Sequence, residues 1–197
     1  ITFANVSSGR AFSFFGGRTA GEQWCYNNSF RDNLIIGQLD KSHLDGNDNV
    51  ALRNIWDNSG TATGYDVVAQ NHVVNFRSNA VSRNNRFAQN VIYKADGFGV
   101  EFTPRGALAH TNIGNVVEYN IIVDTGNDTD PDHEFTAIYI PPEYAPVTVR
   151  NNTIYDPDHT NIIHYRDDGA ISVSAFNRKT ADIISSNISS DPLMFDP

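Results

Sequence analysis

The sequence predicts an all-β fold, a right-handed parallel β-helix of about seven coils with long loops on one face. Two observations predict it. Asparagine is unusually frequent, with 23 residues in a chain of 197, and short apolar segments recur beside it. Asn and Gly disfavour long helices, because Asn competes for the helical hydrogen bonds and Gly loses more backbone entropy. The composition therefore favours stacked turns over helices.

The repeat has the form Asn-x-(Ile or Phe). It occurs in the segments Asn28-Ser29-Phe30, Asn90-Val91-Ile92, Asn120-Ile121-Ile122 and Asn152-Thr153-Ile154. With Asn displaced by one residue, it also occurs at Asn5-Val6, Asn54-Ile55 and Asn187-Ile188. The apolar residues then align as the anchors Val6, Phe30, Ile55, Ile92, Ile122, Ile154 and Ile188. We expect the recurrent amides to hydrogen bond from one coil to the next.

The spacing of these anchors fits a β-helix. Successive anchors lie 24 to 37 residues apart, and a coil needs about 20 or more residues, so the excess is expected in loops. A β-sandwich is the alternative, but it would show hairpin turns every 8–12 residues, roughly, and no fixed Asn register. Residues 1–197 are expected to form a single domain.

Charge and composition limit the function classes. The chain has 14 Lys and Arg against 23 Asp and Glu, so its surface repels nucleic acid and anionic membranes. No apolar stretch approaches the roughly 20 residues of a membrane span. The single cysteine, Cys25, rules out an intrachain disulfide. We expect neither a nucleic-acid partner nor a membrane span.

The coil segments and the closing segment Asn187-Ile188-Ser189-Ser190-Asp191-Pro192-Leu193-Met194-Phe195-Asp196-Pro197 resemble the pectin-lyase-like superfamily of parallel β-helix proteins. That superfamily includes polysaccharide lyases, glycoside hydrolases, tailspikes and adhesins. The resemblance implies a secreted or cell-surface protein whose partner is a polysaccharide or other glycan. Seven coils without a visible capping helix also fit a fragment, or the C-terminal part, of a longer β-helix. Exposed coil ends would then pair with another β-helix segment or with a second copy.

One aligned column carries charge. Two residues after each anchor it reads Ser8, Asp32, Asp57, Lys94, Asp124, Asp156 and Ser190. Because equivalent positions of stacked coils lie about 4.8 Å apart, the aspartates Asp32, Asp57, Asp124 and Asp156 are candidate Ca²⁺ ligands, with Lys94 as a base. Carboxylates alone would raise the pKa of a neighbouring lysine, whereas a bound dication would lower it. The alternative is that each Asp caps a local turn.

The long excursions, at about 57–86, 94–116, 124–148 and 156–182, are the second place for a site, because loops on a rigid solenoid often carry function. The candidate catalytic residues here are Glu101, Arg105, His110, His133 and Glu134. The candidate substrate-binding residues are Arg83, Arg86, Tyr139, His164, Arg166 and Asp167. For the acidic residues a solvated loop charge is the alternative, for Arg83 and Arg86 an ion pair with Asp, and for Tyr139 a place in the core. The tetrad Asp-Pro-Asp-His, present at 130–133 and 156–159, suggests a metal site or an ordinary turn.

The resemblance, taken with these residues, implies a secreted carbohydrate-active enzyme, with a lyase acting on an acidic, uronate-containing polysaccharide favoured. One alternative is a glycoside hydrolase, which requires two carboxyl groups flanking the scissile bond. The other is a non-enzymatic β-helix that binds glycans or builds a fibre.

Overall fold

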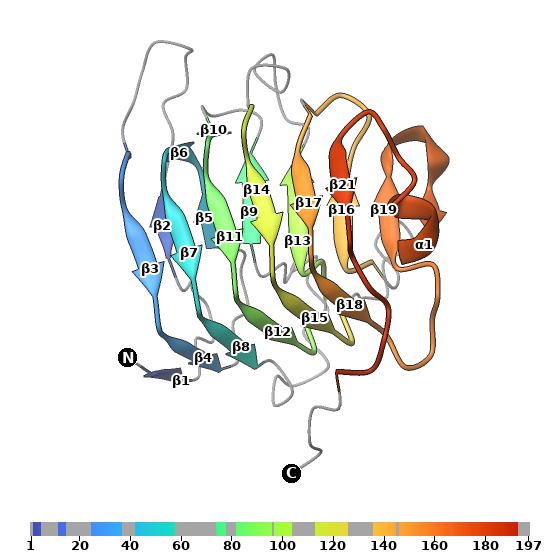
Figure 1. The fold of residues 1–197 in the computed structure, drawn as a ribbon. Coiled ribbons are helices and arrows are strands. Elements are labelled where there is room, and N and C mark those ends of the chain that lie inside the picture. Colours follow the sequence, from blue (N-terminus) through green and yellow to red (C-terminus); the bar gives the residue numbers. More distant parts are fainter. Residues whose placement is uncertain are drawn as a thin grey trace, which may run out of the picture.

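The chain is described by a computed structural model, in which residues 2–4, 12–14, 25–36, 42–57, 74–77, 82–95, 97–103, 113–125, 136–144 and 146–192 are described. The strands of these segments form a parallel β-helix: each coil contributes one strand to each of three long sheets (Figure 1). The predicted fold class is confirmed. None of the helices in these segments is long and apolar enough to cross a membrane.

Sheet A is parallel throughout and contains, in stack order, β1 (Thr2–Ala4), β4 (Leu34–Ile36), β8 (Ile55–Asp57), β12 (Val91–Tyr93), β15 (Ile121–Val123) and β18 (Thr153–Tyr155). Sheet D, also parallel, contains β3 (Ser29–Arg31), β7 (Val50–Leu52), β11 (Arg86–Ala88), β14 (Val116–Glu118), β17 (Thr148–Arg150) and β21 (Ile183–Ser185). Strands of sheet D lead directly into strands of sheet A through a tight corner.

Sheet B closes each coil. It contains β2 (Ser13–Phe14), β5 (Ser42–Leu44), β9 (Val74–Arg77), β13 (Val100–Thr103), β16 (Ile138–Ile140), β19 (Ile163–Tyr165) and β20 (Ala170–Ile171). β20 pairs antiparallel with β19, unlike the other strand pairs of the sheet. A small sheet C pairs β6 (Gly46–Asn47) with β10 (Ser82–Arg83).

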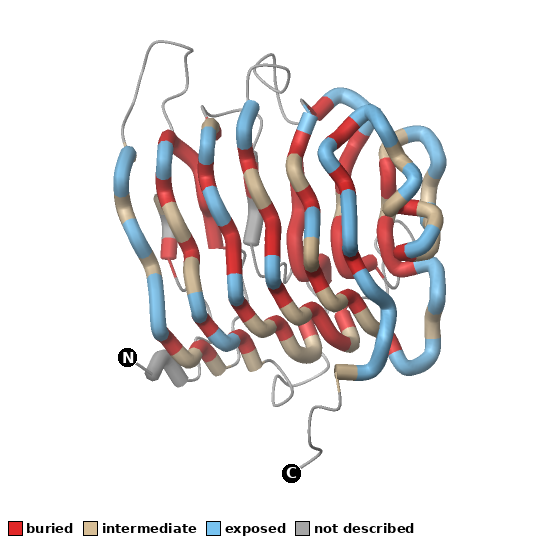
Figure 2. The backbone as a smooth tube through the Cα atoms, in the orientation of Figure 1, coloured by how far each residue is buried: buried red, intermediate tan, exposed pale blue. Residues whose placement is uncertain are grey.

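The core lies inside the coils, because alternate strand residues point inward. In sheet D the central residue of each strand is turned inward, as the alternation of burial along its strands shows (Figure 2). Trp56 is fully buried and its ring centroid lies 5.6 Å from that of Phe87. Phe76 and Phe102 stack on the sheet B side at 4.8 Å. Aromatic and branched side chains thus fill the stack from coil to coil.

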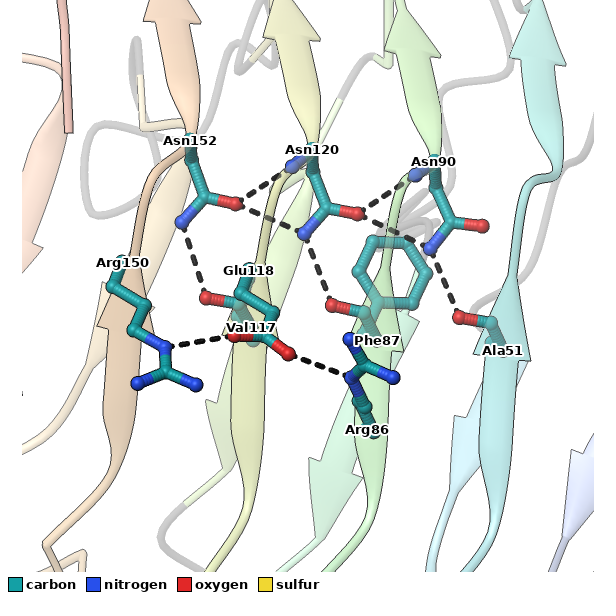
Figure 3. A network of polar contacts seen from close by, with 9 residues as sticks. All are labelled: Ala51, Arg86, Phe87, Asn90, Val117, Glu118, Asn120, Arg150 and Asn152. Atoms are coloured by element: carbon teal, nitrogen blue, oxygen red, sulfur yellow. Dashed lines mark hydrogen bonds and ion pairs between the residues drawn. The ribbon is translucent and has the colours of Figure 1, made fainter. Parts of the chain in front are cut away.

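The corner between sheets D and A is fixed by a ladder of buried asparagines, Asn33, Asn54, Asn90, Asn120, Asn152 and Asn187. The backbone N–H and the side-chain Nδ2 of Asn120 both donate to Oδ1 of Asn152, each at 2.9 Å, and Nδ2 also donates to the carbonyl of Phe87 (Figure 3). Each amide therefore satisfies buried backbone groups in neighbouring coils. The predicted role of Asn is confirmed.

The residue before each ladder Asn has a positive φ, at Asp32, Arg53, Gln89, Tyr119, Asn151 and Ser186. A single left-handed residue turns the chain sharply between two strands. A second ladder, Asn28, Asn49, Asn85 and Asn115, lies just before sheet D and is preceded by Asn27, Asp48, Asn84 and Gly114, which also have positive φ. The same corner is thus built twice in each of these coils.

The second ladder explains an error in the predicted register. Ile92, Ile122 and Ile154 do pair with one another as predicted. Ile92 also pairs with Trp56, however, and not with Ile55, and Trp56 pairs with Ile35. Phe30 belongs to sheet D, where it pairs with Ala51. Asn28-Ser29-Phe30 follows the second ladder, which has the same local pattern as the first.

The remaining predicted anchors lie near the two ends of the chain. Ile188 forms a bridge with Thr153, one residue away from its predicted partner Ile154. Val6 lies outside the described residues.

The C-terminal end of the stack carries a cap that the sequence analysis did not predict. The helix α1 (Val173–Phe176) follows β20 and lies beside β19 (Figure 1). Phe176 is fully buried, with its ring 5.5 Å from Tyr165. Asn177 then completes the first ladder, because its Oδ1 accepts hydrogen bonds from the backbone N–H and the Nδ2 of Asn187 at 3.2 and 3.0 Å. The helix was missed because four residues show no periodicity.

An ion pair fastens this cap. Where the second ladder would continue, Val147 stands in place of Asn, and its N–H donates to Oδ1 of buried Asp182 at 2.8 Å. Arg166, from the 3₁₀ helix Arg166–Asp168, donates to both oxygens of Asp182, and Tyr165 donates to Oδ2. Burial and the hydrogen bond to Asp182 raise the pKa of Tyr165 to about 12.

Candidate functional site

The central positions of the sheet B strands pair with one another from coil to coil and form a row. His43 pairs with Asn75, Asn75 with Glu101, Glu101 with Tyr139, and Tyr139 with His164. Their neighbours in each strand, such as Val100 and Phe102 beside Glu101, fill the core. We call these positions the outer row of sheet B. His43 and Glu101 are buried, whereas Tyr139 and His164 are half-buried, so the row becomes more accessible toward the C-terminal coils.

Ring stacking orders the accessible part of this row. The rings of Phe98 and Tyr139 are nearly parallel, with centroids 4.9 Å apart. On the next coil the imidazole of His164 lies 4.8 Å from the Tyr139 ring. Such contacts contribute about 0.5–1.5 kcal/mol beyond burial. The phenol and the imidazole are therefore held side by side.

A second, shorter row lies at the corner where sheet A leads into sheet B. Lys94, Asp124 and Asp156 directly follow the paired residues Tyr93, Val123 and Tyr155. The Nζ atom of Lys94 lies 4.0 Å from Oδ2 of Asp124 and 5.1 Å from the centroid of the Tyr93 ring. We call Lys94, Asp124 and Asp156 the corner row. It occupies the same three coils as Glu101, Tyr139 and His164.

The predicted acidic column is therefore shorter than expected. Asp32 lies at the other corner, between sheets D and A, where both of its oxygens accept hydrogen bonds from Arg53 at 2.6 and 2.7 Å. The hydrogen bond from Arg53 holds the pKa of Asp32 below its usual range. Asp57 pairs with Tyr93, one residue before the position of Lys94. Both errors follow from the register error at Phe30 and Ile55.

Asp156 behaves as a turn cap on one side. Its Oδ1 accepts from the backbone N–H groups of Asp158 and His159 at 2.9 and 2.8 Å, and it lies 2.9 Å from Nδ1 of His159. These hydrogen bonds show that the second Asp-Pro-Asp-His tetrad forms a turn capped by its first Asp. Its Oδ2 is buried and makes no hydrogen bond. No group of three or more His, Cys, Asp or Glu in the described segments could hold a metal ion, so a Ca²⁺ site stays a prediction that rests on Asp124 and Asp156.

The other predicted binding residues are dispersed. Arg86 lies on sheet D and donates to buried Glu118. Half-buried Arg83 lies on β10 in sheet C. Arg166 is occupied by Asp182 and by carbonyl oxygens of Pro142 and Tyr144.

At the C-terminal cap, a pocket of about 330 Å³ is lined by Tyr165, Arg166, Asp167, Asp168, Lys179, Thr180 and Ala181. Asp168 and Lys179 form an ion pair of 2.7 Å within it. This pocket brings the predicted residues Arg166 and Asp167 together, and none of the residues that line it belongs to the outer row. Arg105, His110, His133 and Glu134 lie outside the described residues.

Several buried charged or polar groups were not among the candidates predicted from the sequence. His43 and Asp45 are fully buried, with Nδ1 and Oδ2 4.0 Å apart, at the N-terminal end of the outer row. Glu118 is buried between two arginines. Glu118 ends strand β14, and the strands of the coils before and after it carry Arg86 and Arg150. This pattern is the signal from which the buried Glu118 could have been predicted.

Comparisons with protein-family models, with curated proteins and with solved structures find no match for this chain.

Proposed function

We propose that this protein is a secreted, carbohydrate-active member of the pectin-lyase-like superfamily that binds an acidic polysaccharide across the outer row of sheet B and cleaves it by elimination. The observation that supports this most is the alignment of two rows on three consecutive coils. The corner row supplies a cation beside carboxylates, and the outer row supplies a carboxyl, a phenol and an imidazole.

These groups suit the chemistry of elimination. A base removes the proton at C5 of a uronate residue, the electron pair forms the C4–C5 double bond, and the C4–O bond breaks as an acid protonates the leaving oxygen. An imidazole accepts a proton at neutral pH, and a phenol can donate one. We assign these roles to His164 and Tyr139.

Lys94 then acts as the partner of the substrate carboxylate. Its Nζ atom lies 4.0 Å from Oδ2 of Asp124 at the surface of the corner, where an ammonium group can pair with the carboxylate of a uronate. Calcium bound near Asp124 and Asp156 would reverse this assignment, because a dication favours the neutral amine. A chelator and the Lys94→Ala variant distinguish the two roles of Lys94. Lys94 acts as the base if both abolish activity, and as the partner of the substrate carboxylate if activity survives the chelator.

Elimination fits the described outer row better than hydrolysis. Hydrolysis needs two carboxyl groups about 5–9.5 Å apart, and in the described strands of this row Glu101 is the one carboxylate. A hydrolase therefore remains the alternative that would depend on Glu101.

The test is incubation with a uronate polymer, with and without calcium or chelator, following the ultraviolet absorbance of the unsaturated product. Wild type should generate it, and Tyr139→Phe and His164→Ala should each lower the rate about 100-fold, within the usual range for general acid–base groups. Tyr26→Phe, at an exposed tyrosine far along the sequence from the row, is the matched control and should keep full activity.

Three outcomes would overturn the proposal. New reducing ends without absorbance would identify a hydrolase. Binding without cleavage would identify a non-enzymatic glycan-binding β-helix. Elimination that survives both row variants would move the reaction away from Tyr139 and His164.

A further inference from the structure

A second charged arrangement lies on sheet D, a different face of the coils from sheet B (Figure 1). Nε of Arg86 donates to Oε1 of Glu118 at 2.6 Å, and Nε of Arg150 donates to Oε2 at 2.7 Å (Figure 3). The three side chains come from the adjacent strands β11, β14 and β17. We call them the arginine clamp.

The clamp leaves donors facing outward. The Glu118 side chain is only 5% exposed, whereas those of Arg86 and Arg150 are each 44% exposed. Each arginine uses Nε for Glu118, and among the described residues its Nη groups have no other polar partner. A guanidinium held on one side in this way presents a flat pair of N–H donors, which matches a carboxylate or sulfate.

The charge balance also favours an anionic ligand. One arginine would neutralise Glu118, so the second leaves an excess positive charge. The described strands of sheet D carry three arginines, Arg31, Arg86 and Arg150, against the single acid Glu118. The chain as a whole has a net charge of −9. This face is therefore basic within an acidic protein, which attracts polyanions to it selectively.

The carboxylate is kept charged by its partners. Burial alone would raise the pKa of Glu118, but hydrogen bonds from Arg150 and Arg86 outweigh burial and hold the pKa below its usual range. Glu118 therefore stays ionised at neutral pH and keeps both guanidinium groups in place without competing for their outward donors.

We infer that the arginine clamp is a second binding site, distinct from the outer row of sheet B, for the oxyanion groups of an acidic polysaccharide. The polymer class rests on the proposed function, whereas the site itself does not require cleavage. A carboxylate or a sulfate would lie over Glu118 and accept N–H donors from Arg86 and Arg150. Such a site would hold a long chain on the protein independently of the reaction.

The test measures binding, so that it does not depend on activity. The binding of polygalacturonate, dextran sulfate and uncharged dextran is measured by affinity electrophoresis, in a His164→Ala background in which cleavage should be about 100-fold slower. Arg86→Gln and Arg150→Gln should each weaken binding of a charged polymer about tenfold, the usual loss for a charge-assisted hydrogen bond. Arg178→Gln removes one charge from an exposed residue that follows helix α1 and belongs to no strand of sheet D, and it should change affinity little.

Arg86→Lys keeps the charge and an ion pair with Glu118 but lacks the planar fork, so it should fold normally and still bind less tightly. Loss with only one charged polymer would distinguish carboxylate from sulfate as the ligand. Wild-type affinity in folded Arg86→Gln and Arg150→Gln proteins would overturn the inference, as would an equal loss in Arg178→Gln. If the clamp variants lose binding while the protein with His164 intact does not cleave the polymer, the clamp stands and the proposed function fails.

Discussion

The corner between sheets D and A repeats one residue type from coil to coil, whereas the outer row of sheet B changes type at every coil. At the corner, Asn occupies a buried position in each successive rung and satisfies the same backbone groups. In the outer row, Glu101, Tyr139 and His164 occupy equivalent positions but carry a carboxyl, a phenol and an imidazole. We infer that one corner with a constant residue type is enough to hold each coil in register, so that the residues on the outer face of sheet B can differ from coil to coil.

The largest effect should come from breaking the corner. Asn120→Ala leaves the N–H of Asn90 and the carbonyl of Phe87 without their amide partner inside the protein. We expect a loss of about 3 kcal/mol in the free energy of unfolding, since each unsatisfied buried group costs about 1–3 kcal/mol. Urea denaturation measures this loss. Asn161→Ala, at an exposed Asn, is the control and should stay within about 0.5 kcal/mol of wild type.

A smaller, pH-dependent effect on the free energy of unfolding is expected at Glu118. This residue is buried like the corner asparagines, but its side chain lies on the outside of sheet D. Its pKa is lowered in the folded state, so its stabilising contribution is present above the ordinary Glu value of about 4.3 and is lost as the pH falls through the folded-state pKa.

Glu118→Gln should therefore be less stable than wild type at pH 7, by about 1–2 kcal/mol, and the difference should shrink at acid pH. Denaturation from neutral to acid pH measures it. A difference independent of pH would mean that ionisation of Glu118 is not what stabilises this face.

The smallest effect on stability should come from the outer row. Tyr139→Phe retains the ring that stacks on Phe98, so the free energy of unfolding should change by less than about 0.5 kcal/mol. Thermal and urea denaturation check this. A large loss of stability would show that the outer row is structural and would weaken the contrast with the corner.

The fold was predictable because successive coils have an Asn directly before a short apolar strand, and this local pattern does not depend on the length of the loops between coils. The coils at Ile92, Ile122 and Ile154 were placed correctly for that reason. Phe30 was misplaced because Asn28 and Asn90 belong to two ladders with the same local pattern, and Ile55 was misplaced by one residue because Trp56 holds the position equivalent to Ile92. Nothing in the local sequence distinguishes one corner from the other.

The candidate site was less predictable for a physical reason. The segment from sheet A to sheet B spans residues 94–99 in one coil, 124–137 in the next and 156–162 in the next. Because these lengths differ, sequence spacing does not align Glu101 with Tyr139 or Tyr139 with His164. Each of these residues was named as a candidate, but their alignment depends on sheet pairing between coils.

Because of Asn177, the way in which the last coil is capped does not depend on the number of coils in the solenoid. It offers the last rung an amide like that of a further coil, although it belongs to a helical cap. Successive ladder residues such as Asn120 and Asn152 are 32 residues apart, and each makes the same hydrogen bond to the next ladder Asn. Duplication of such a unit upstream of the cap would lengthen the molecule without creating a new terminus. The architecture is thus suited to growth by internal tandem duplication, in evolution or in the laboratory.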